Sequence, residues 1–308
     1  MLRYTIKNIA YSLLVILGVI TVSFLLIYVM PGDPVKAILG ERADQKTVEA
    51  VKSELGLDKP LTERYILYIY KVFTGDLGKS YVSNRNVLST ILEKFPATAI
   101  LAFSSLLISA VFGILFGVIA AVRQNSFIDK FLMIISLFGI SAPQFVLGLF
   151  FIFLFGSVLG IFPLSGYINN GFEYLILPAI TLAIRPLTII TRITKSSMLD
   201  VMNMDYIKTA RAKGLSEFRI YFRHCLRNSL NPLITTLSTI LAATLGGAFF
   251  VEFIFNWPGM GLLAIDSIMK LDFPMIQGTV LVTAVVFVII NLFVDLLYAF
   301  IDPKVKLT

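Results

Sequence analysis

Long apolar runs alternate with polar connections along the chain and set its expected secondary structure. Six runs approach or exceed the roughly 20 apolar residues that a helix needs to cross a bilayer, and they cover 9–30, 97–122, 131–157, 174–191, 233–255 and 279–301. They are continuous, unlike the alternating ten-residue strands of a membrane barrel. The first run is too long for a signal peptide and no cleavage site follows it, so we expect it to be retained. The pattern predicts an all-α, polytopic membrane protein with six transmembrane helices.

The polar connections divide the chain into segments. Residues 1–30 hold the N-terminal end and the first span, 31–96 a large extramembrane segment, 97–301 the other five spans, and 302–308 a tail. Within 31–96 we expect helices over 47–55 and 60–73, stopped by Gly56 and Gly75. The connection 192–232 is the longest polar one within 97–301.

Composition and charge then fix the class and the topology. The 308 residues are 57% hydrophobic and only 15% charged, which excludes a soluble globular enzyme. Lys and Arg number 26 against 19 acids, giving a net charge of +7, and such an excess could bind nucleic acid. Fourteen of the basic residues, however, fall in the connections on one side of the expected membrane, and Lys270 alone in the short ones opposite. The positive-inside rule therefore predicts cytoplasmic N- and C-termini and an extracytoplasmic 31–96 segment, with no nucleic-acid role.

The sequence gives little support to two other classes of protein. An intramembrane protease or metalloenzyme needs a base or a set of ligands, but the chain has one histidine, His224, one cysteine, Cys225, and no H-E-x-x-H. No G-x-x-x-x-G-K-[ST] phosphate loop occurs either. An ion-coupled secondary transporter would be expected to bury several carboxylates, whereas Asp295 is the one acid well inside a predicted span.

The 192–232 connection carries the most informative local pattern. Its alanines and basic residues favour a helix up to Lys213, Gly214 supplies a residue that can adopt positive φ and end it, and Ser216 can cap the next helix. Such a helix–turn–helix suits docking in a groove of a partner protein. A basic connector lying near anionic lipid headgroups is the alternative.

This connection resembles the EAA loop of ABC-transporter permeases. Residues 206–214 read Tyr-x-x-Thr-Ala-Arg-Ala-Lys-Gly, as in the branch that imports dipeptides, oligopeptides, glutathione or nickel, although Lys208 and Thr209 replace the name-giving Glu and first Ala. Further matching blocks are Pro31-Gly32-Asp33-Pro34, 55–60, 75–78, 255–261 and Asp302-Pro303. The resemblance covers the whole chain. It implies a MetI-like, type I importer permease, the first of a pair, in a bacterial or archaeal plasma (inner) membrane.

The resemblance also implies partners and a docking site. The chain would pair with a second permease subunit, two cytoplasmic ATPases that hold ATP and Mg, and an extracytoplasmic binding protein, with no cofactor or metal of its own. Peptide, either di- or oligopeptide, is the expected cargo, with glutathione or chelated nickel as the alternative. The coupling helix near 205–216 would meet the ATPase through Asp205, Tyr206, Ile207, Thr209, Ala210, Arg211, Lys213, Gly214 and Leu215.

Polar side chains within the spans are candidates for the translocation pathway. Ionisable groups inside a membrane are functional hypotheses, and Arg185 could meet a peptide carboxylate in a central cavity. Interhelical pairing or extension toward the inner face are its alternatives. The other candidates are Ser141, Gln144, Thr181, Thr188, Asn291 and Asp295. We also expect Pro143 and Pro178 to kink their helices, and Asp266 and Asp272 to be solvated rather than bound to the binding protein.

Overall fold

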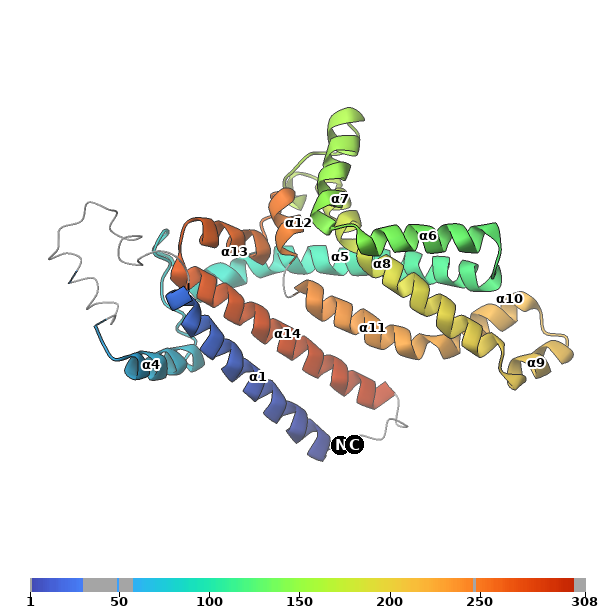
Figure 1. Cartoon of the computed structure of the whole chain (residues 1–308), viewed down its shortest axis with the longest axis horizontal. Coiled ribbons are helices and arrows are strands. Elements are labelled where there is room, and N and C mark those ends of the chain that lie inside the picture. The colour runs from blue at the N-terminus through green and yellow to red at the C-terminus, as the bar shows by residue number, and fades with distance from the viewer. Residues whose placement is uncertain (1, 30–48, 50–57, 246–247, 302–308) are drawn as a thin grey trace. The chain divides into compact units, whose positions relative to one another are not determined.

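The computed structural model describes residues 2–29, 49, 58–245 and 248–301 (Figure 1). Apart from Glu49, the expected helix over 47–55 lies outside these residues, as do Gly56, the tail 302–308 and the side chain of Asp295. The helices in chain order are α1 (Leu2–Val29), α4 (Leu61–Phe73), α5 (Val87–Val122), α6 (Phe127–Ser141), α7 (Gln144–Phe151), η1 (Ile152–Val158), η2 (Ile168–Asn170), α8 (Glu173–Met202), α9 (Asp205–Ala212), α10 (Glu217–Arg219), η3 (Ile220–Leu226), α11 (Arg227–Leu245), α12 (Phe249–Ile254), α13 (Met260–Met269) and α14 (Phe273–Ile301).

Several of these helices are long and apolar enough to cross a membrane. Among the described residues α5, α8 and the 273–293 part of α14 qualify individually, and α6 with α7 and η1 would make a fourth span if the bent pair is one. The apolar parts of α1 and α11, Ile9–Leu25 and Pro232–Leu245, are shorter. The prediction of an all-helical polytopic membrane protein is confirmed, whereas the count of six spans stays a prediction.

The apolar run 131–157 forms two helices rather than the single helix we expected. Ala142 and Pro143 are extended, with ψ of 129° and 133°, and α7 leaves at 105° to α6 (Figure 1). Proline has no N–H to continue a helix and disfavours helical backbone in the residue before it. The kink expected at Pro143 is therefore a complete break, whereas α8 continues through Pro178 and Pro186.

Two compact units make up the described chain, and the first combines residues 1–98 with 258–308. Helices α1 and α14 pack along each other, and α4 is fastened to α1 by hydrogen bonds between Thr21 and Tyr65 (2.6 Å) and between Ser23 and Tyr68 (2.7 Å). The Gln277 side chain of α14 donates to the Ser23 carbonyl at 2.8 Å. Helix α4 follows Pro60 and is stopped by Gly75 at φ +77°, as the sequence predicted.

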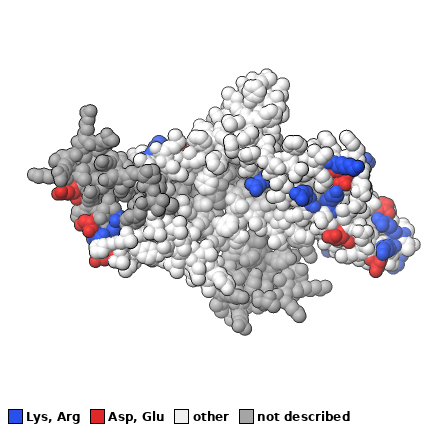
Figure 2. Space-filling view, in the orientation of Figure 1, with Lys and Arg blue, Asp and Glu red and all other residues white. Residues whose placement is uncertain are grey.

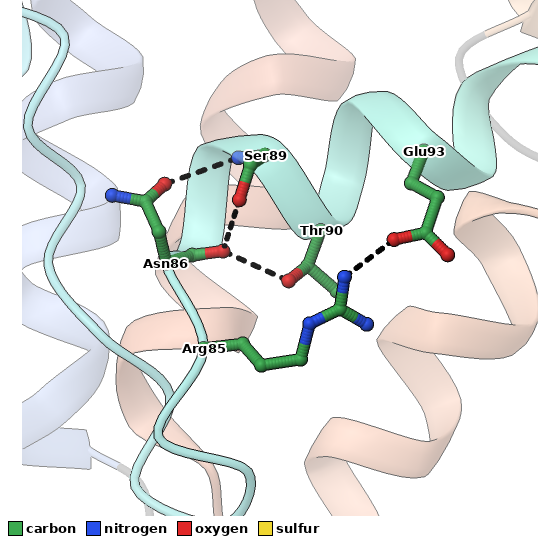
Figure 3. Close-up of polar contacts among 5 residues, drawn as sticks. All are labelled: Arg85, Asn86, Ser89, Thr90 and Glu93. Carbon is green, nitrogen blue, oxygen red and sulfur yellow. Dashed lines mark hydrogen bonds and ion pairs between the residues drawn. The ribbon is translucent and has the colours of Figure 1, made fainter.

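Polar caps in this unit fix the start of α5, ten residues before the apolar run that we identified as the second span. The Asn86 side chain accepts the Ser89 N–H at 3.1 Å and its carbonyl accepts the Thr90 hydroxyl at 2.8 Å, while Arg85 pairs with Glu93 at 2.5 Å (Figure 3).

The turn before α5 is also tied to the start of α14. Asp272 accepts the Ser80 hydroxyl at 2.5 Å and the Tyr81 N–H at 3.0 Å, and it is only 4% exposed. The expectation that Asp272 is solvated was wrong, because the carboxylate closes this turn instead.

The second unit, residues 99–257, is built around α8. Glycines on two neighbouring helices, α5 and α6, let α8 approach closely. A Cβ on Gly117 of α5 would lie 2.4 Å from Thr194 Cβ, and one on Gly139 of α6 would lie 2.5 Å from Thr188 Cγ2. A Cβ on Gly148 of α7 would make only an ordinary contact with Thr181, at 3.4 Å. Small residues at such crossings let the helices make close van der Waals contact. This contact drives their association in lipid, where a hydrophobic driving force between helices is missing.

We predict that Gly117→Ala destabilises the second unit, because the new methyl group would overlap Thr194 and the Thr191 carbonyl, which lies 2.7 Å from its position. Overpacking of this kind costs about 1–3 kcal/mol, so the purified protein should melt at a lower temperature in detergent. Gly18→Ala in α1 is the matched control, since nothing lies within 4 Å of its Cβ. Equal melting temperatures for the two variants would contradict the close α5–α8 contact.

Candidate functional site

The connection between α8 and α11, residues 203–226, forms a compact element at one end of the second unit. Its first helix, α9, ends where predicted: Gly214 has φ +76°, and its N–H donates to the Arg211 carbonyl at 2.9 Å. The next N–H, of Leu215, donates to the Ala210 carbonyl at 3.3 Å. Both bonds together make a Schellman motif, in which a left-handed glycine satisfies the last carbonyls of a helix.

The inner face of α9 anchors the element to the rest of the unit. Ile207 is fully buried and Ala210 is 8% exposed. They belong to one apolar cluster with Val118, Ala121, Met198, Val201, Ile220 and Cys225, which come from α5, α8 and η3. Leu215 packs against the same cluster. Two of the residues that we expected to meet a partner thus hold α9 in place, and the exposed face consists of Asp205, Tyr206, Lys208, Thr209, Arg211 and Lys213.

An ion pair bridges the glycine turn. Arg211 donates from Nε to Glu217 Oε1 at 3.0 Å and from a terminal nitrogen to Oε2 at 3.4 Å. The hydrogen bond from Arg211, followed by that of Tyr221, holds the pKa of the Glu217 carboxyl below its usual value. Because the carboxyl pKa is lowered, the bridge stabilises the turn at pH values above the ordinary carboxyl pKa near 4. This stabilisation is lost as the pH falls through the lowered pKa. The bridge is therefore complete at neutral pH.

Sequence reasoning missed Glu217, because it assigned the Arg211 charge to a partner. The available signal was an acid six residues beyond Arg211, across a glycine turn. Tyr206 is also held in place, since Asn228 of α11 donates to its hydroxyl at 2.7 Å.

Charged side chains gather at the end formed by α9 and α10 (Figure 2), so this element is the most polar part of an otherwise apolar unit.

A second candidate site is a cavity of about 330 Å³ where the broken helix meets α8 and α11. Its lining brings together two of the candidate pathway residues, Arg185 and Gln144. The full lining is Gln144, Leu182, Arg185, Pro186, Ile189, Ile240, Ala243, Thr244 and Ala248. Ser141 is exposed at the end of α6, and Thr188 and Thr181 are buried beneath Gly139 and Gly148, outside this lining. Asn291 belongs to the first unit and donates to its own helix at Phe287.

Pro186 explains the position of Gln144. Because proline lacks an N–H, the carbonyl four residues earlier, at Leu182, has no partner within α8. The Gln144 amide nitrogen approaches that carbonyl at 3.4 Å. Gln144 thus joins the start of α7 to the middle of α8.

A buried ion pair, also missed from the sequence, lies elsewhere on α8. Lys195 contacts Asp129 at 2.5 Å, and the carboxylate also accepts the Asn125 N–H at 2.9 Å. Asp129 is 4% exposed. The sequence signal was the spacing from Ser126, whose side chain caps α6 by accepting the Asp129 N–H at 3.3 Å.

Two family models match the chain. One, described as the N-terminal part of the membrane component of binding-protein-dependent transport systems, matches residues 1–102, and the inner membrane component itself matches 113–307. Curated relatives include the glutathione transport system permease proteins GsiC of Escherichia coli K12 and of Shigella flexneri serotype 5b. Each is 39% identical over 306 residues, 99% of both chains.

A solved structure shares the fold. It is an inward-facing form of the MetNI methionine ABC transporter, with a TM-score of 0.58 and 18% identity over 70% of this chain and 97% of that one. The resemblance found in the sequence and the MetI-like fold are both confirmed, and the family implies a complex with an ATPase and a binding protein. The chain therefore belongs to the inner membrane components of binding-protein-dependent transport systems, the multi-pass, non-catalytic permease subunits of ABC transporters.

Proposed function

We propose that the chain forms half of the pathway of an ABC importer for glutathione or a closely related small peptide. The observation that carries this proposal is the 39% identity to glutathione permeases, which extends over 99% of the chain. It favours glutathione over the di- or oligopeptide cargo that we first expected. Chelated nickel stays the alternative cargo to be tested.

The assembly that we propose contains a second permease subunit, two ATP-binding subunits and an extracytoplasmic binding protein. Six spans, with both termini in the cytoplasm, would follow from the apolar runs and the side on which the basic residues lie. In that topology the element 203–226 faces the cytoplasm, where the ATP-binding subunits hold ATP and Mg.

The exposed face of α9 is our proposed docking surface for an ATP-binding subunit. Tyr206, Thr209, Arg211 and Lys213 are exposed, while Ile207 and Ala210 are buried against the ends of α5 and α8. A displacement of the docked ATPase would thus pass directly into those two helices. Rigid rocking of packed helices is a known way to convert such a push into alternating access.

The cargo assignment predicts ATP-dependent glutathione uptake. Proteoliposomes containing the complete transporter, with ATP inside and binding protein outside, should accumulate labelled glutathione and should not do so with a non-hydrolysable ATP analogue. Trialanine and nickel–histidine in tenfold excess should compete weakly. Accumulation of either competitor without glutathione would show that the cargo is wrong, and uptake driven by an ion gradient without ATP would refute the ABC mechanism.

The docking proposal predicts a strong effect at the glycine turn. Gly214→Val should reduce co-purification of the ATP-binding subunits and lower coupled transport about tenfold, because a β-branched residue is strained at φ +76°. Gly214→Asn is the matched control, since asparagine tolerates the left-handed region and nothing lies within 4 Å of the new Cβ. Wild-type binding and transport in the valine variant would contradict the role of the turn.

The Arg211–Glu217 bridge predicts a change in protease sensitivity. Glu217→Gln removes the charge that holds the turn, so trypsin should cleave after Lys213 several times faster at neutral pH. Glu93→Gln removes an ion pair of similar exposure on α5 and should leave this cleavage unchanged. Equal cleavage rates in the two variants would mean that the bridge does not order the turn.

A further inference from the structure

The cavity beside the broken helix has the chemistry of an anion site. Most of its wall is apolar, from Leu182, Pro186, Ile189, Ile240 and two alanines, and Arg185 is the single charged residue among the described lining residues. At about 330 Å³ it falls at the small end of ligand pockets. It could enclose one end of a tripeptide rather than the whole molecule.

Arg185 differs in its surroundings from Lys195, another cation of α8. Lys195, ten residues further along, is closed off by its ion pair with Asp129. No carboxylate within the described residues lies within ion-pair distance of Arg185. The backbone carbonyl of Arg185 accepts the Thr188 hydroxyl. Arg185 is exposed in the described chain, so its guanidinium is accessible to an anion that enters the cavity.

The broken helix adds a second attraction for an anion. Gln144 is the first residue of the eight-residue α7 and lines the cavity, so the N-terminal end of that helix lies at the site. This end carries partial positive charge. Half-helices that begin inside a membrane commonly direct this end toward anionic substrate groups.

Polar acceptors complete the lining. Gln144 uses an amide N–H on the Leu182 carbonyl, which leaves its side-chain oxygen as an acceptor. The Thr244 hydroxyl donates to Ile240 at 2.7 Å and keeps its oxygen lone pairs. The site therefore presents donors for a carboxylate beside acceptors for a peptide N–H.

We propose that Arg185, with the N-terminal end of α7, binds one carboxylate of the peptide cargo in this cavity, while Gln144 and Thr244 accept an adjacent N–H. This inference rests on the proposed function for the identity of the cargo. The single cation limits the site to one carboxylate, so the second carboxylate of glutathione would be held elsewhere.

The first test measures the charge and occupancy of the cavity without requiring transport. Ala243→Cys, in a Cys225→Ala background within the complete transporter, is reacted with anionic and cationic methanethiosulfonates. Adding Arg185→Gln should lower the anionic-to-cationic rate ratio about tenfold, as expected for loss of a neighbouring unit charge. The control is Arg192→Gln, which removes another exposed arginine two turns further along α8. It should change the ratio less than twofold.

The same cysteine reports binding. S-Methylglutathione at millimolar concentration should slow the reaction several-fold when Arg185 is present and not in Arg185→Gln. An unchanged rate ratio, or protection that persists without Arg185, would overturn the proposal.

The second test pairs the arginine with the charge of the cargo. Arg185→Gln should lower ATP-driven uptake of glutathione about tenfold, and Arg185→Lys should recover part of it. One of two glutathione analogues, each with one carboxylate converted to an amide, should show no further loss in Arg185→Gln. Equal losses for all three cargoes would mean that Arg185 acts on the protein rather than on the cargo, which overturns the proposal.

The two tests separate the inference from the proposed function. If the wild-type transporter takes up no glutathione but S-methylglutathione protection depends on Arg185, the importer assignment is wrong and the carboxylate site stands. If uptake is normal but neither the rate ratio nor protection depends on Arg185, only the site is wrong.

Discussion

Close packing against α8 is the constraint on which the second unit depends. Three residues of that helix, Thr188, Ile190 and Thr194, lie where a side chain on a facing glycine would collide with them. Because helices in lipid gain little from apolar burial, van der Waals contact at such crossings must supply the association. The helix that these contacts hold is also the one that carries Arg185 at the cavity and leads directly into α9.

The helix pattern was predictable because it depends on local chemistry. Apolar runs, Gly75, Gly214 and the proline at the start of α4 gave elements that the structure reproduces. The break at Pro143 was underestimated as a kink, since its angle depends on where α7 can pack and not on proline alone. The early start of α5 was missed because Asn86 and the Arg85–Glu93 pair extend a helix beyond its apolar residues.

The sites were predictable only in part, since burial depends on the tertiary arrangement. Motif spacing identified 205–215, but it could not show that Ile207 and Ala210 face inward while Tyr206 and Thr209 face outward. Polarity within the spans suggested six uncharged or basic candidates, of which Arg185 was the strongest. The structure joins only Arg185 and Gln144 in one cavity, because the carbonyl freed by Pro186 attracts the glutamine across the helix break.

Two of the three cations of α8, Lys195 and Arg185, make opposite contributions, and the difference suggests how the helix combines stability with transport. Lys195 is balanced by Asp129, whose other oxygen accepts an N–H at the start of α6, so this pair fixes α6 to α8. Breaking such a buried pair costs about 3–5 kcal/mol, which keeps this end of the helix bundle rigid. Arg185 lies about three turns away with no such counter-charge among the described residues. A permease requires both arrangements, because a push on α9 is transmitted only through fixed contacts and cargo can bind only where a charge is still unbalanced.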